Sequence, residues 1–303
     1  MPNPQASSGQ RSNAEHYIYR TYEGSEHLLQ AVLAPATGIA DHDRTSLTPG
    51  VKTAGSSFNR GTASLDEAVT LARRGWKEGI KALDGMRMSV EHQLEGTVPI
   101  PETRHRLYGN VINMGRHMQG KPDVFMHRVD SAIMRETGKP RVIRLVFNAT
   151  VSGSISADTI LRRGAAACVL AETLELHRMR VQIELAFATS NRIEGGDVIE
   201  HRLVVKQFGE PLALDKLSFF LSHPASLRRL FFALLEHEDK ADRARFGIGR
   251  DFGASMGFPG EVEDQGDIYL PRIVSNTDWS PALTTMWLTE TLKEQGLKLP
   301  RTP

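Results

Sequence analysis

Short apolar runs in the second half of the chain predict the strands of a sheet. Val142 to Phe147 is nearly continuous in apolar, often β-branched residues, which is typical of a strand buried on both faces. Val181 to Ala188 alternates apolar and polar residues, so we expect a strand with one partly solvated face. A turn with adjacent glycines, Asn191 to Asp197, leads into Val198 to Phe208, which predicts a hairpin with an antiparallel edge strand.

Helical patterns surround these strands. Ser156 is a candidate N-cap, and Asp158 follows in the first turn, where a negative charge complements the helix dipole. Pro271 lies inside the candidate strand Ile268 to Ser275 and counts against that assignment. The predicted helices of this half are Ser156 to Arg178, Leu214 to Leu221, Pro224 to His237 and Pro281 to Gln295.

The chain before Arg141 has fewer regular patterns. Residues 1–16 are polar and lack apolar periodicity, which predicts a disordered tail. Residues 17–140 predict a helical and irregular N-terminal extension, with a capped helix from Ser64 to Ala82 and a helix near Phe125 to Arg135. We therefore expect an α/β domain over residues 141–303, with three layers and a mostly parallel sheet carrying one antiparallel edge strand.

Composition excludes several classes of protein. The chain has 303 residues, 37 basic and 36 acidic side chains, a net charge of +1 and one cysteine. Such a balance argues against bulk nucleic-acid binding, and a single Cys168 excludes an internal disulfide framework. The N-terminus has no apolar segment of a secretory signal, and no run of eighteen apolar residues follows. We expect a cytoplasmic protein that does not contact a membrane.

The order strand, helix, strand, antiparallel strand, helices, strand and helix from Arg141 to Leu299 resembles the von Willebrand factor A-type fold, a Rossmann-type architecture. That resemblance implies a metal site after the first strand, in the pattern Asp-x-Ser-x-Ser, with a later Asp in a Thr-Asp-Gly setting. The matching positions here are Asn148, Thr150, Ser152 and Asp278.

The first Asp of that pattern is absent. A hard cation needs oxygen ligands that carry negative charge, and Asn148 offers a neutral carbonyl instead. We therefore expect no cofactor, and Ser152 and Asp278 remain the candidates for a divalent cation. The alternative interpretation is a polar loop that caps the following helix, because Asn, Thr and Ser are common in turns.

Three phrases carry a second resemblance. SLDEAVTLARRGWKEG, RRGAAACVLAETLE and LSHPASLRRLFFALLE are similar to an uncharacterised family of tailed bacteriophages and prophages, a domain of unknown function. The resemblance implies a phage-encoded protein in the bacterial host cytoplasm or the virion. It transfers no catalytic residue.

No catalytic motif is evident, so the sequence leaves enzymatic activity open and favours its absence. Neither a His-Glu-x-x-His helix nor a Gly-x-Ser-x-Gly elbow is present. We expect a phage-type accessory or structural protein that binds a protein partner, or assembles with itself or the virion, through the loops at the carboxyl ends of its strands. The residues expected to line that edge are Asn148, Thr150, Ser152, Asp278 and Trp279, with Trp287 in the core.

Two other functions stay open. The stretch 104–144 is the most basic in the chain and has interleaved aromatic residues, a combination that can bind single-stranded nucleic acid. We favour a solvated surface instead, because no recognisable nucleic-acid module accompanies these charges. A metal-dependent enzyme or metal-mediated adhesion module is the other alternative; it would require Asp158 or Asp251 to join Asp278. The candidate nucleic-acid contacts are Arg104, Arg106, Arg116, Lys121 and Arg128.

Overall fold

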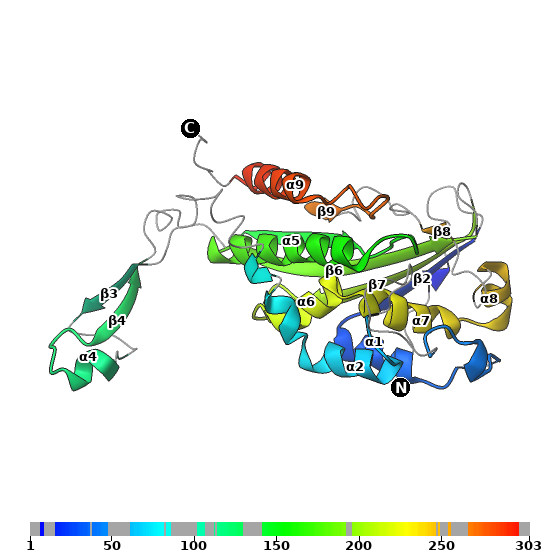
Figure 1. Ribbon diagram of the computed structural model, residues 1–303, viewed down its shortest axis with the longest axis horizontal. Coiled ribbons are helices and arrows are strands. Elements are labelled where there is room, and N and C mark those ends of the chain that lie inside the picture. The colour runs from blue at the N-terminus through cyan, green and yellow to red at the C-terminus, as the bar shows by residue number, and fades with distance from the viewer. Residues whose placement is uncertain are drawn as a thin grey trace.

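The computed structural model is an α/β structure built on one large sheet (Figure 1). It describes residues 7–8, 16–36, 38–47, 61–81, 83–85, 102–106, 112, 114–129, 141–191, 196–246, 248, 254–255 and 266–296. The main strands follow the order β2-β7-β6-β5-β9, and two-residue strands add to β2 and β6. The strands are β1 (Ser7–Ser8), β2 (Tyr17–Tyr22), β5 (Val142–Asn148), β6 (Arg180–Ser190), β7 (Val198–Lys206), β8 (Ala254–Ser255) and β9 (Ile268–Leu270).

Most neighbouring strands are parallel. β5 pairs in parallel with both β6 and β9, β2 pairs in parallel with β7, and only the β6–β7 pair among these five strands is antiparallel. The predicted hairpin of β6 and β7 is therefore confirmed. The prediction that its second strand lies at the edge is wrong, because β2 covers the free edge of β7 along six residues.

The N-terminal part contributes to the main sheet. β2 comes from the segment expected to form an extension, and Ser7 and Ser8 of the expected tail pair with Tyr19 and Ile18. The rest of that tail, residues 1–6 and 9–15, lies outside the described residues. The sheet thus gains strands from before Arg141 that the second half alone does not supply.

The predicted helix starts agree with the structure. Ser156 Oγ accepts the Thr159 amide at 3.2 Å, and Ser64 Oγ accepts the Glu67 amide at 3.1 Å, so both serines are N-caps. Helical residues 224–236 begin at Pro224 and include a π-helical segment. The labelled helices of the main body are α1 (Ser25–Leu33), η1 (Asp41–Asp43), α2 (Leu65–Arg74), α5 (Ala157–Leu176), α6 (Leu214–Ser222), η2 (Ser226–Phe231), α7 (Phe232–Glu236), α8 (Lys240–Phe246) and α9 (Pro281–Glu294). Residues 77–81 and 83–85 are also helical, so the helix predicted from Ser64 to Ala82 is interrupted at Gly75 and Trp76.

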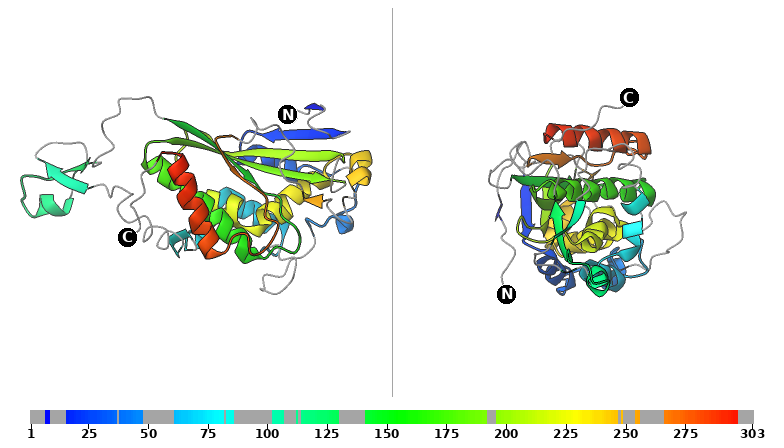
Figure 2. Two further views of the ribbon diagram at one scale, coloured as in Figure 1. Left: turned by 90° about the horizontal axis from the view of Figure 1, so that it is seen from above. Right: turned by 90° about the vertical axis from the view of Figure 1, so that its left-hand side faces the viewer.

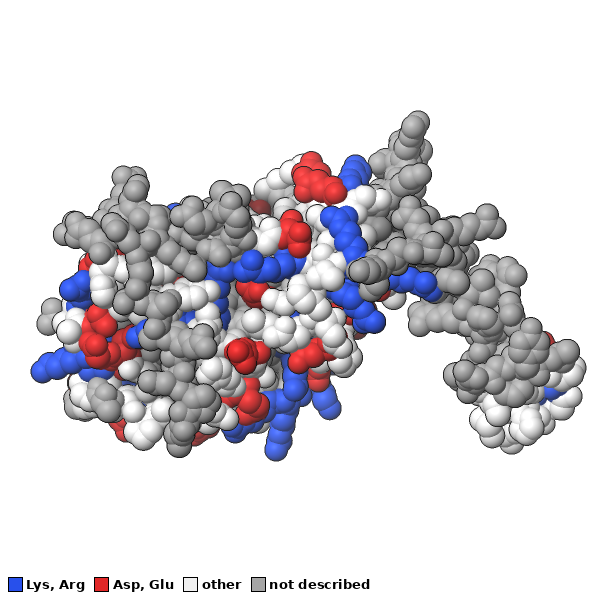
Figure 3. Space-filling view, turned by 180° about the vertical axis from the view of Figure 1, so that it is seen from behind, with Lys and Arg blue, Asp and Glu red and all other residues white. Residues whose placement is uncertain are grey.

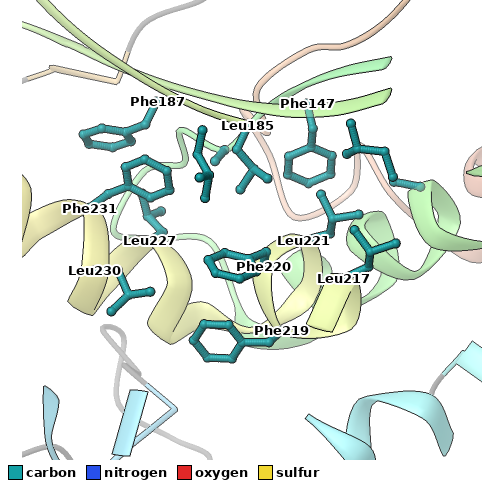
Figure 4. Packing of buried hydrophobic residues seen from close by; sticks show 14 of the residues in the cluster. Phe147, Leu185, Phe187, Leu217, Phe219, Phe220, Leu221, Leu227, Leu230 and Phe231 are labelled. Atoms are coloured by element: carbon teal, nitrogen blue, oxygen red, sulfur yellow. The ribbon is translucent and has the colours of Figure 1, made fainter. Parts of the chain in front are cut away.

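One hydrophobic core joins the helices to one face of the sheet. Figure 2 shows the helices gathered on one side of the strands, and alternate strand residues such as Leu145, Phe147 and Leu185 belong to this core. Figure 4 shows Phe187 against Phe231 of η2, with ring centroids 5.2 Å apart. The mostly parallel sheet with one antiparallel pair agrees with the expected α/β class, and the described helices cover one of its faces.

A second, two-stranded sheet stands apart from the first. β3 (Glu102–Arg106) pairs with β4 (Phe125–Val129), and α4 (Met114–Met118) lies between them in the chain. Figure 1 draws this hairpin unit at one end of the molecule. The prediction of a helix from Phe125 is therefore wrong for 125–129, where pairing with β3 determines the conformation; residues 130–135 lie outside the described part.

Candidate functional site

Two loops leave the carboxyl ends of neighbouring strands β5 and β9, the edge at which the sequence predicts a partner site. The strands run in parallel, and beyond them Val151 and Ile273 form one further parallel bridge. We call residues 152–156 and 274–278 the strand-end surface. Among the residues predicted for this site, Asn148 and Thr150 are buried, Ser152 is half-buried and Asp278 is exposed.

Asn148 and Thr150 form hydrogen bonds inside the protein. The Asn148 amide nitrogen donates to the Tyr269 hydroxyl at 3.0 Å, and its oxygen accepts the Thr150 amide at 2.9 Å. The Thr150 hydroxyl accepts from the Ala188 amide at 3.0 Å and donates to the Ala188 carbonyl at 3.2 Å. These two side chains therefore hold β5, β6 and β9 together at the strand ends, whereas the cap of the following helix α5 is Ser156.

Arg163 of α5 provides a positive charge beneath the same edge. Its Nη2 donates to the carbonyl oxygens of Asn148, Leu270 and Pro271 at 2.8, 3.0 and 2.6 Å. The guanidinium also lies over the Phe147 ring, 3.9 Å from its centroid. Burial lowers the pKa of Arg163 to about 9, so it stays protonated at neutral pH. A protein cation thus satisfies the carbonyl groups at which two strands end.

The exposed part of the edge is held together by hydrogen bonds between the two loops. Asn276 accepts the Ser156 amide at 2.8 Å and donates to the Ser154 carbonyl at 3.2 Å. One Asp278 oxygen accepts the amides of Val274 and Ser275 at 2.8 and 2.7 Å. The loops therefore form one ordered surface.

Trp279 does not face outward. Its side chain is buried, and its ring meets that of half-buried Trp287 edge-on at 5.3 Å between centroids. The prediction that Trp279 is accessible is therefore wrong, whereas Trp287 packs against the hydrophobic core. The reason is that the loop turns back into α9, where Arg162 of α5 donates to the Trp279 carbonyl at 3.0 Å.

Within the described part of the chain, no group of three or more His, Cys, Asp or Glu side chains is arranged to hold a metal ion. The Asp278 carboxylate accepts two backbone amides, and the Ser152 hydroxyl lies 3.2 Å from that of Ser154. Asp158 is exposed in the first turn of α5, and Asp251 lies outside the described residues.

The structure brings the five predicted basic residues into the hairpin unit. β3 carries Arg104 and Arg106, β4 carries Arg128, and the segment between them carries Arg116 and Lys121. Arg116 donates to both oxygens of one carboxylate, that of Asp123, at 2.6 and 2.7 Å, whereas the Lys121 side chain is exposed.

An ion-pair line, which sequence reasoning missed, crosses the face of the sheet opposite the helices. Arg144 donates to both oxygens of Glu184 at 2.8 and 2.9 Å, and Arg202 lies between Glu184 and Glu200. Tyr17 of β2 donates to Glu200, so the line joins β5, β6, β7 and β2. A different order of strands would separate these partners and leave a buried charge without one, so the ion pairs favour the observed order of β5, β6, β7 and β2.

A second missed network ties the N-terminal loop to α7. The buried Glu236 carboxylate accepts from Arg44 Nε at 3.2 Å and from the Ser46 amide at 2.9 Å. Arg229 donates to the Ser46 carbonyl at 2.6 Å and the Thr62 carbonyl at 2.9 Å. Arg228 and Arg229 are adjacent in an otherwise apolar run. This was the available sequence signal for a buried polar network, because both side chains cannot face solvent on a buried helix.

Residues 10–299 match the profile of a family described as Domain of unknown function (DUF7192). The chain belongs to the DUF7192 family. Comparison with curated proteins and with solved structures gives no match. The family match agrees with the sequence resemblance to a domain of unknown function, and no activity comes with it. None of the described helices has the length and apolar character needed to cross a membrane.

Proposed function

We propose that this DUF7192 protein is a non-catalytic binding protein that holds a protein partner on its strand-end surface. The observation that carries the proposal is the pair of exposed loops bonded to each other through Asn276, Ser154 and Ser156. A surface ordered before binding loses less conformational entropy when a partner docks. Asn276, Thr277 and Asp278 are all exposed there.

Apolar side chains at the same edge support this proposal. Val274 is 67% exposed, and Leu283 and Met286 in the first turns of α9 are 42% and 51% exposed. Protein interfaces commonly combine such apolar contacts with a polar rim. We expect the partner to bury Val274 and to hydrogen-bond with the loop that contains Thr277.

The strand order β7-β6-β5-β9, with α5 after the first of these strands in the chain, supports a relation to the von Willebrand factor A-type fold. The three sequence phrases support a phage-encoded accessory or structural protein in the bacterial cytoplasm or the virion. In this proposal the Arg163 guanidinium supplies the positive charge at the strand ends, where it binds three carbonyl oxygens.

A pair of photo-crosslinking variants tests the proposed surface. A crosslinking residue replaces Thr277 in one protein and Glu210 in the other, and both positions are exposed. Glu210 follows β7, which runs antiparallel to β6, so it lies beyond the opposite ends of the strands. We expect one defined partner to crosslink at position 277 and not at 210. With that purified partner, Val274→Glu should weaken binding about tenfold or more, and Glu210→Lys should not. Equal crosslinking at both positions would contradict the proposal.

Nucleic-acid binding by the hairpin unit is a second candidate function. The residues from 102 to 129 contain five basic and two acidic side chains, a net charge of +3 (5 − 2), whereas the whole chain has +1. The face of the molecule in Figure 3 instead mixes acidic and basic side chains. Basic two-stranded ribbons fit the major groove of DNA, and basic aromatic surfaces bind single strands.

Salt-dependent binding of labelled DNA tests this second function. If the hairpin binds phosphate, Lys121→Glu should weaken binding. It should also make the dependence of the logarithm of the binding constant on the logarithm of salt concentration less steep, by an amount that corresponds to about one or two phosphate contacts. Arg116→Ala should have less effect, because Asp123 already pairs with that guanidinium. Binding that is independent of salt, or equal for wild type and Lys121→Glu, would argue against it.

A further inference from the structure

A small cavity lies beneath the strand-end loops, between β5, α5, α6 and η2. Its volume of about 20 Å³ suits one water-sized molecule or ion. Most of its wall is apolar, and Figure 4 shows Phe147, Phe220, Leu221 and Leu227 converging from the sheet and the helices. A cavity lined only by apolar side chains can stay empty.

The polar part of the wall changes that expectation. Arg163, His223 and Ser226 line the cavity, and all three are buried. Arg163 Nε and Ser226 Oγ are buried without a hydrogen-bond partner in the described structure. A buried polar group without a partner costs about 1–3 kcal/mol, so native proteins usually supply one. Both groups therefore indicate that something polar occupies the cavity.

The charge of the wall is positive. Arg163 takes part in none of the ion pairs between described residues; it binds three carbonyl oxygens through Nη2 instead. Nδ1 of His223 accepts the Ala225 amide at 3.1 Å, and burial lowers the pKa of this imidazole to about 4, so it is neutral at pH 7. The lining thus has one cation, one hydroxyl and no carboxylate.

We propose that this cavity binds a single small anion of chloride size, held by the Arg163 Nε–H and the Ser226 hydroxyl. A water molecule also accepts from these donors, but among the lining side chains only the Ser226 oxygen is left to accept from it, because His223 Nδ1 already accepts the Ala225 amide. An anion accepts from both donors and neutralises a buried guanidinium, which water does not. The inference goes beyond the proposed partner binding and is independent of it.

Thermal unfolding of the full-length protein at constant ionic strength tests the site. Sodium gluconate is replaced stepwise by chloride or bromide at pH 7.5. We expect the unfolding temperature to rise by about 2–4 °C and to saturate, because an anion that binds only the native state stabilises it. Ser226→Ala removes one donor and should raise the half-saturating chloride concentration about tenfold.

Ser222→Ala is the matched control. Its hydroxyl is also buried without a partner, but Ser222 does not line the cavity, so this variant should keep the wild-type chloride response. Identical unfolding in chloride and gluconate, or equal effects of the two serine variants, would overturn the proposal. Anomalous scattering from bromide in crystals of the wild-type protein gives a direct measurement: a peak beside Arg163 supports the site, and its absence overturns it.

Discussion

The close approach of α5 and α6 gives the sharpest stability prediction. At Gly164 a Cβ atom would lie 2.2 Å from the Leu221 carbonyl oxygen and 2.4 Å from both the Leu221 carbonyl carbon and Ser222 Oγ. Ordinary contacts begin near 3.4 Å, so Gly164→Ala is short of space by about 1 Å. Because two of the three atoms belong to the backbone, a change of rotamer cannot relieve the clash, and the helices must separate.

The expected cost follows from two opposing terms. Overpacking costs about 3 kcal/mol or more when backbone must move, and the better helix propensity of alanine returns about 1 kcal/mol. We therefore expect a net loss of about 2 kcal/mol and an unfolding temperature lower by about 4 °C or more. Gly209→Ala is the control, since nothing lies within 4 Å of the added Cβ there. If Gly164→Ala unfolds at or above the wild-type temperature in calorimetry, the described helix packing is wrong.

Three further predictions concern charge. Burial lowers the pKa of His201 to about 3 and that of His223 to about 4, so the folded state keeps both neutral while the unfolded state protonates below pH 6.5. The free energy of unfolding should then fall as pH drops through 6.5, by about 2 kcal/mol per histidine at pH 5 in urea titrations. His201→Gln should lose the share of this fall that is due to His201; the same fall with pH in this variant as in the wild type would contradict a neutral, buried His201. Millimolar Mg²⁺ or Mn²⁺ should leave the unfolding temperature unchanged, because Asp278 is engaged by backbone amides; a rise that Asp278→Ala abolishes would revive a metal site. Glu236→Ala should cost about 3–5 kcal/mol because it removes the buried carboxylate that accepts from Arg44 and from the Ser46 amide, and wild-type stability in calorimetry would refute the network.

The sequence predicted local elements well because their signals are local. The alternation from Val181 and the serine cap at Ser156 each act within a few residues, and β6 and α5 follow them. The predicted strand Ile268 to Ser275 is confirmed only for Ile268–Leu270, because β9 ends at the residue before Pro271. Whether another strand pairs with the outer side of β7 is decided by tertiary structure. No pattern in residues 198–206 indicates that β2 pairs there.

The candidate site was harder to predict for the same reason. Asn148 and Thr150 were placed correctly at the end of a strand, yet their hydrogen-bond partners, Tyr269 and Ala188, come from other strands. Arg163 lies one helical turn from Ile160 on the buried side of α5, a signal that an arginine there needs internal partners. Which carbonyl groups it would bind depends on the packing of α5 against β5 and β9.

The pairing of β2 with β7 has a consequence for how the chain folds. Tyr17 pairs with Val198, so 181 residues (198 − 17) separate the two partners. At a synthesis rate of about 5–20 residues per second, β2 leaves the ribosome some 9–36 s before the edge that it must join exists. Contacts this distant in sequence also slow folding by raising the contact order. An unpaired strand with apolar and aromatic residues is a site of aggregation during that interval, so we expect production of this protein to depend on chaperones that hold its N-terminal segment.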